Sequence, residues 1–154
     1  MRIEVDQSGK IEQTNFNTVL AYSDGVRGSV LVKATTKRRL VLALRAQGFS
    51  GTWFYTLLFV VCLYLLLKKV LGGVTTVEID EEYTGKQRII KEELEGLFLR
   101  VGLDRRNLPE IYFRRVTKKS KAHYYGWAVF KKKTKPDRVL TFDEIMSVVK
   151  KRVG

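Results

Sequence analysis

Three residues of this sequence could together bind a divalent metal ion: Asp6, Asp80 and His123. Asp6 closes the strand-like stretch MRIEVD, and Asp80 closes the β-branched stretch VTTVEID. His123 falls in the first turn of a later predicted helix, from which it can point back over the sheet. If the two strands are neighbours in the centre of the sheet, both carboxylates lie close together. Phosphodiester hydrolysis uses such a site, because metal ions activate water and stabilise the leaving oxygen.

Each of these residues has a simpler explanation when it is taken alone. An aspartate at a strand end is commonly a turn former, and a lone histidine is commonly structural. The prediction of a catalytic metal site therefore depends on the three residues occurring together at compatible positions.

Acidic residues are concentrated around Asp80, although the 154-residue chain has a formal net charge of +13. Repulsion between neighbouring carboxylates is relieved by a divalent cation, and Mg²⁺ and Mn²⁺ prefer carboxylate oxygens. We therefore expect Mg²⁺ or Mn²⁺ as cofactor. The fourth ligand is Glu82, or Asp137 if the chain returns to the site. Glu78 ranks below Asp80, because it lies two residues further back in the strand.

The excess of basic residues predicts nucleic acid as the partner, since Lys and Arg release counterions from phosphate backbones. Adaptation to a salty cytoplasm and binding to anionic membranes are the alternatives. The residues expected to contact nucleic acid are Lys37, Arg38, Arg39, Arg114, Arg115, Lys118, Lys119, Lys121 and Tyr124.

Aromatic residues are interleaved with the second group of cations, which is typical of a groove for single strands, where bases stack on rings. For Trp127 and Phe130 we favour packing in the core. For Tyr124 and Tyr125 the core and the groove remain equal alternatives.

The element order predicts one α/β domain over residues 1–154, with a mixed five-stranded sheet covered by helices on both faces. Three antiparallel strands come first, and strands alternate with helices afterwards. The predicted strands are 1–6, 17–23, 27–33, 74–80 and 110–116, and the predicted helices are 35–46, about 50–71, 86–102, 120–131 and 141–151.

The run WFYTLLFVVCLYLLL at 53–67 is almost entirely apolar. It is shorter than the roughly 20 residues of a spanning helix, so we predict a buried core helix with an inert Cys62. A small membrane-associated protein built on 53–71 is the alternative, and a homo-oligomer formed through this run is a further option. The N-terminal residues do not resemble a signal peptide, so we expect no membrane partner and a cytoplasmic location.

Three segments resemble motifs of the RNase H-like superfamily. IEVDQSGK is similar to its first-strand motif and VEIDEEYTG to its fourth-strand motif, while KAHYYGWAVFKKK resembles the Ala-His segment of Argonaute and UvrC nuclease domains. Asp6, Asp80 and His123 match the Asp-Asp-His triad of those domains. The resemblance covers about residues 1–131 and implies a metal-dependent nuclease.

The chain also looks like small archaeal proteins of this fold that are thought to degrade single-stranded DNA. It is therefore expected to be a 3′–5′ exodeoxyribonuclease, and the abundance of Lys, Arg and Glu suggests a thermophilic source. The helix-borne glutamate of cellular RNase H is missing, because 25–77 contains no acid. This departure argues against RNA:DNA hybrid cleavage by the usual route. A binding module of the same fold without catalysis is the alternative function.

Overall fold

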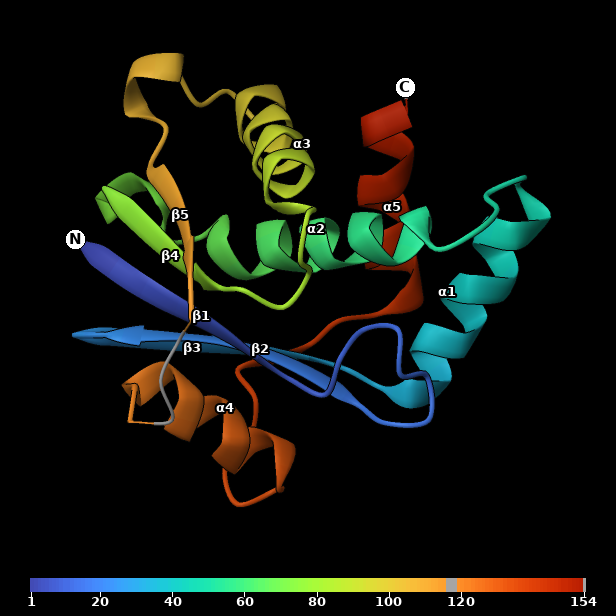
Figure 1. The fold of residues 1–154 in the computed structure, drawn as a ribbon, viewed down its shortest axis with the longest axis horizontal. Helices are drawn as coiled ribbons and strands as arrows, with labels where there is room; N and C mark the ends of the chain where they lie inside the picture. The colour runs from blue at the N-terminus through green and yellow to red at the C-terminus, as the bar shows by residue number, and fades with distance from the viewer. Residues whose placement is uncertain (116–118, 154) are drawn as a thin grey trace.

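The computed structural model describes residues 1–115 and 119–153 and has an α/β architecture built on one six-stranded mixed sheet (Figure 1). The strands lie in the order β5-β4-β1-β2-β3-β6. They are β1 (Arg2–Ser8), β2 (Thr18–Asp24), β3 (Val26–Val32), β4 (Thr76–Asp80), β5 (Glu110–Arg114) and β6 (Arg138–Val139). The helices are α1 (Ala34–Ala46), α2 (Trp53–Leu67), α3 (Gln87–Arg100), α4 (Lys121–Phe130) and α5 (Phe142–Val153), with short 3-10 turns at Leu71–Gly73 and Arg105–Asn107.

The first three strands form the antiparallel meander that the turn residues predict. The β2–β3 connection uses Gly25 at φ 84°, a left-handed backbone conformation that glycine adopts without a steric penalty. Strand β1 then pairs in parallel with β4, with Val5 opposite Ile79. Strand β5 adds in parallel to β4 and forms one edge of the sheet.

The predicted count of five strands is wrong, because β6 adds a sixth. This strand has only two residues, Arg138 and Val139, which pair in parallel with Val30 and Leu31 of β3. A two-residue strand is too short to show an alternating pattern, so no sequence signal marked it. Helix α2 is also shorter than expected, since Gly51 adopts φ 69° in the turn before it.

The apolar run forms α2, which lies between the sheet and helix α3 (Figure 1). Every residue of α2 except Trp53 and Tyr55 is buried, so the prediction of a core helix is confirmed. Burial of each large apolar side chain contributes about 1.5–3 kcal/mol, which makes this helix the main source of core stability. Burial also raises the pKa of the Cys62 thiol to about 12. Within the part of the chain that the structure describes, no helix is long and apolar enough to cross a membrane.

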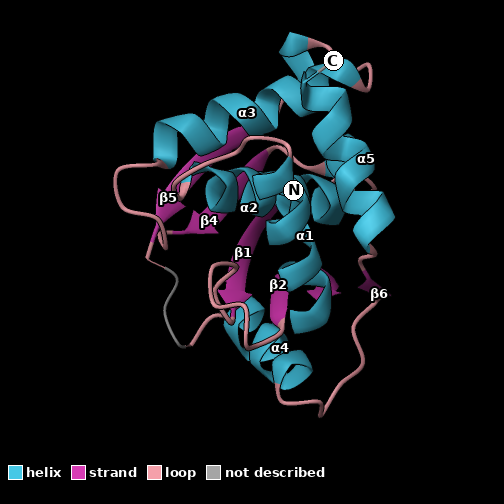
Figure 2. Cartoon of the chain, turned by 90° about the vertical axis from the view of Figure 1, so that its right-hand side faces the viewer, coloured by secondary structure: helices cyan, strands magenta, loops and turns pink. Residues whose placement is uncertain are grey.

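The two faces of the sheet are covered unequally, as Figure 2 shows. Helices α1, α2, α3 and α5 lie on one face and enclose the large core. Helix α4 packs on the opposite face against β1 and β2, where Tyr125 and Val129 meet Val19 and Ala21. The half of this second face formed by β4 and β5 carries polar side chains.

Lys37 is buried, which corrects its prediction as a nucleic-acid contact. Its ammonium donates to the carbonyl oxygens of Lys10 and Gln13 at 3.2 and 2.6 Å and to Thr18 Oγ1 at 2.9 Å. It lies on the inward face of α1 with 0% of its surface exposed, because the loop 9–17 folds over it. Burial lowers the pKa of Lys37 to about 8. This lysine holds the β1–β2 loop in place and cannot reach a phosphate.

Replacing Lys37 with methionine should destabilise the protein while keeping the aliphatic packing. The variant removes the ammonium that joins the Lys10 and Gln13 carbonyl oxygens to the buried Thr18 hydroxyl, so the free energy of unfolding should fall by about 2–4 kcal/mol. Urea denaturation followed by circular dichroism measures this change. The exposed Lys91→Met on α3 serves as control and should change it by less than about 0.5 kcal/mol. Equal stability of both variants would show that the buried ammonium does not anchor the loop.

Candidate metal centre and nucleic-acid surface

Parallel pairing of β1 with β4 brings Asp6 and Asp80 together, as the sequence predicts. Both aspartates directly follow the paired residues Val5 and Ile79; Asp80 ends β4, whereas β1 continues to Ser8 beyond the predicted end at Asp6. Glu82 joins them from a tight turn, in which its amide donates to the Asp80 carbonyl at 3.0 Å. One carboxylate oxygen of each of the three residues lies within 4.8 Å of the others. Three converging carboxylates can hold a metal ion.

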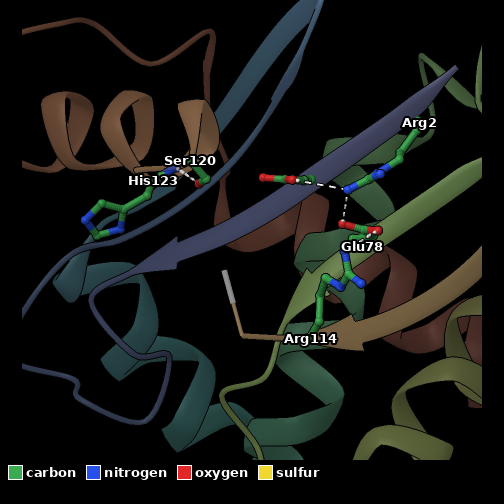
Figure 3. A network of polar contacts seen from close by, with 6 residues as sticks. Arg2, Glu78, Arg114, Ser120 and His123 are labelled. Atoms are coloured by element: carbon green, nitrogen blue, oxygen red, sulfur yellow. Dashed lines mark hydrogen bonds and ion pairs between the residues drawn. The ribbon is translucent and has the colours of Figure 1, made fainter. Parts of the chain in front are cut away.

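His123 contacts this group through Asp6, with 2.9 Å between its Nδ1 and Asp6 Oδ2. Helix α4 presents the histidine in its first turn, which Ser120 caps: Ser120 Oγ accepts from the His123 amide at 3.0 Å. Figure 3 shows both residues at the start of α4. His123 therefore lies beside the three carboxylates and fixes the orientation of Asp6.

The three carboxylates are close enough to repel one another when they are ionised. The pKa of Asp6 is raised to about 6, mainly by burial and also by the neighbouring Asp80 carboxylate. The hydrogen bond with His123 acts in the opposite direction and lowers this pKa. Burial and the Asp80 carboxylate raise the pKa of Glu82 to about 7. The ammonium of Lys10 is 4.0 Å from Glu82 and half exposed, so it offsets this charge weakly. A cation between the carboxylates would remove the repulsion.

Two further acids considered as ligands lie outside this group. Glu78 accepts from Arg2 at 2.9 Å and from Arg114 at 3.1 Å, in the network drawn in Figure 3. Asp137 accepts from the amide of Ser29 at 3.0 Å. The alternative of Asp137 as fourth ligand is wrong, because the chain returns to the sheet at β3, two strands away from β1.

Four of the predicted phosphate contacts surround one depression of about 370 Å³ near the start of α4. Arg114 and Arg115 come from the end of β5, and Lys119 and Lys121 come from the loop and the first turn of α4. Glu4, Ser23, Asp24 and Ser120 complete the lining. Ser120 belongs to the same turn as His123, so this cationic depression adjoins the carboxylates.

The basic residues of α1 are not part of this depression. Arg38 donates to the Thr14 carbonyl at 2.8 Å, and the Arg39 guanidinium lies 4.3 Å from the centre of the Phe142 ring on α5. Both side chains are exposed, and each contacts a residue outside α1. Lys118, also predicted to contact nucleic acid, lies outside the described residues.

The aromatic residues of α4 differ from the expectation in which of them are buried and which are exposed. Tyr125 is buried and shares a 2.9 Å hydrogen bond with Ser29, while Tyr124 is 61% exposed. Trp127 is 45% exposed, so its placement in the core was wrong; Phe130 is half buried. The helical spacing contained this signal, because Trp127 lies four residues after His123 and shares its side of the helix.

Sequence reasoning missed Tyr83 and Lys10, which support the site from the loop side. The Tyr83 hydroxyl lies 3.2 Å from Gln7 Oε1 and 3.1 Å from Glu12 Oε2, joining the turn after β4 to the β1–β2 loop. Tyr83 follows Asp80 by three residues, but nothing in the spacing indicated its partners. Nothing in the sequence around Lys10 indicated that it would lie near Glu82.

Comparison with known proteins finds no match: no family, no curated protein and no solved structure is significantly similar to this chain.

The raised pKa values of Asp6 and Glu82 predict a pH-dependent stability without metal. A carboxyl group with a higher pKa in the folded state stabilises the fold at low pH, and this contribution is lost as pH rises through about 6–7. Glu82→Gln should therefore raise Tm in EDTA at pH 7.5 by about 2–4 °C and have little effect near pH 4. Thermal scans of both proteins give the answer, with Glu92→Gln on exposed α3 as control. A lower Tm of Glu82→Gln at pH 7.5 would contradict the repulsion.

Metal binding should appear as a thermal shift. Mn²⁺ at about a hundredfold excess over its Kd should raise Tm of the wild type by about 5–10 °C, because the ion binds only the folded protein. Asp80→Asn should lose most of this shift, and Glu92→Gln should keep it. The expectation fails if Asp80→Asn responds to Mn²⁺ like the wild type.

Proposed function

We propose that this chain is a divalent-metal-dependent nuclease with an RNase H-like fold. The observation that carries the proposal is the convergence of Asp6, Asp80 and Glu82 within 4.8 Å, beside His123 and a depression lined by four cations. A carboxylate group adjoining a cationic surface is the arrangement that phosphodiester hydrolysis requires. The cations would attract the polyanion, and the carboxylates would hold the metal ion.

The order of the strands supports the fold assignment. A three-stranded antiparallel meander, extended in parallel beyond β1 by β4 and then β5, is the arrangement expected of an RNase H-like domain. In such a sheet the first and fourth strands are central neighbours. Their carboxyl ends therefore present Asp6 and Asp80 side by side.

The donor set fits Mg²⁺ or Mn²⁺, because all three converging ligands are carboxylate oxygens. When bound, the ion would activate water and stabilise the leaving oxygen. Asp6, Asp80 and Glu82 would hold it. His123 either completes the ligand set or moves a proton as general acid or base, with its Nδ1 oriented by Asp6.

Single-stranded DNA is the proposed substrate, degraded from the 3′ end. Arg114, Arg115, Lys119 and Lys121 would bind its backbone in the cationic depression. The exposed Tyr124 ring adjoins His123, with 6.2 Å between ring centroids, and offers a stacking surface for a base. Strand polarity is carried over from the resemblance of IEVDQSGK, VEIDEEYTG and KAHYYGWAVFKKK to nuclease motifs.

Cleavage of end-labelled single-stranded DNA, duplex DNA and RNA tests this function. The wild type with Mn²⁺ should shorten single-stranded DNA in a ladder from the 3′ end, and EDTA should abolish the reaction. Asp6→Asn should reduce the rate by more than about a hundredfold, because it removes a charged ligand and the partner of His123.

Glu92→Gln on exposed α3 is the matched control and should cleave at the wild-type rate. Metal-independent DNA binding without cleavage of any substrate, unchanged in Asp6→Asn, would exclude the nuclease. The chain would then be a nucleic-acid-binding module.

A further inference from the structure

Beyond the metal centre, the outer side of α4 carries an aromatic surface that continues from Tyr124 to Trp127. This α4 strip consists of Tyr124, Trp127 and Lys131, and Phe130 packs behind Trp127. Successive members of the strip lie three or four residues apart, so they share one side of the helix. The strip begins beside His123 and runs to the C-terminal end of α4.

Trp127 is the centre of the strip. Its ring stacks on Phe130 with 6.2 Å between centroids and 30° between planes, and Lys131 Nζ lies 4.5 Å from its centroid. Phe130 is packed against the small core under α4, which gives the tryptophan a firm backing. Trp127 keeps 45% of its surface exposed. An exposed indole whose position is held by neighbouring side chains offers a surface on which a further planar group can stack.

The charge around the strip indicates which class of ligand would supply that planar group. Residues 111–136 contain no acid, and the segment after α4 adds exposed cations at Lys131, Lys132, Lys133 and Lys135. An aromatic surface bordered by lysines complements an anion that carries planar apolar groups. Unpaired nucleotides have both features, since the phosphate meets the lysines while the base stacks on the ring.

The position of the strip relative to the metal centre sets the path of the strand. Trp127 lies one helical turn, about 5.4 Å, beyond His123, and the cationic depression lies at the other end of α4 beside Ser120. A single strand running along α4 would therefore cross the carboxylates between its contacts with the depression and with the strip.

We propose that the α4 strip is the base-stacking platform of the protein and selects single-stranded over duplex nucleic acid through Trp127. The inference deepens the proposed nuclease function and rests on it for the role of the strand as substrate. Bases in a duplex stack on one another and have no free face for the ring, so the platform gains nothing from duplex DNA.

Binding in EDTA tests the platform without any cleavage. Fluorescence anisotropy of a labelled oligothymidylate of about 12 nucleotides gives Kd for wild type, Trp127→Ala and Trp127→Phe. Trp127→Ala should weaken binding about 5- to 150-fold, the loss expected for one stacked base. Trp127→Phe should retain most of the affinity, because phenylalanine preserves a flat ring.

A second readout places the base on the ring itself. The chain has two tryptophans, so Trp53→Phe leaves Trp127 as the single indole, and its emission should be quenched by oligothymidylate. Leu42→Ala is the matched control, since Leu42 is an exposed apolar side chain on α1. It should bind like the wild type, and all variants should keep the wild-type circular dichroism spectrum.

Wild-type affinity of a folded Trp127→Ala would overturn the platform, as would an equal loss of affinity for single-stranded and duplex DNA. These results are separate from the nuclease test. Trp127-dependent binding in a protein that cleaves no substrate supports the platform and removes the nuclease, whereas Asp6-dependent cleavage without any effect of Trp127→Ala removes the platform alone.

Discussion

Parallel pairing between β1 and β4 is the constraint on which the arrangement depends. Residues 6 and 80 are far apart in the chain, and the register that sets Val5 opposite Ile79 brings their carboxylates together. A parallel pair needs a long crossover, which here contains β2, β3, α1 and α2. The crossover can close on the sheet because α2 is apolar on all sides and fits inside the core.

A second consequence is electrostatic. The centre concentrates negative charge inside a protein with a net charge of +13, and burial makes the concentration costly. Several cations of the described residues have other partners or lie further away: Lys37 donates to backbone oxygens, Lys10 Nζ is 4.0 Å from Glu82, and Arg2 and Arg114 pair with Glu78. The three carboxylates converge where a cation could bind, and the basic residues around them attract anions.

Helix α4 links these features. Its buried side, with Tyr125 and Val129, attaches it to β2. Its first turn carries His123 to Asp6, and its outer side carries Trp127. One amphipathic helix therefore orients a carboxylate, borders the cationic depression and offers an aromatic surface. Because these groups belong to one rigid element, their spacing is set by helical geometry.

The sequence by itself determined the α/β class, ten of the elements and the buried nature of α2, since these follow from periodicity, and it identified Asp6 and Asp80 as candidates whose convergence depended on the pairing of their strands. Only the tertiary structure decided that Lys37 is buried, that β6 and Asp137 lie at β3, that Glu82 joins the carboxylates and that Trp127 is exposed. Local patterns indicate which face of an element is apolar. They do not indicate which loop covers a lysine or which residues of a helix stay exposed after the helix packs on the sheet. Those outcomes depend on packing between segments distant in the chain.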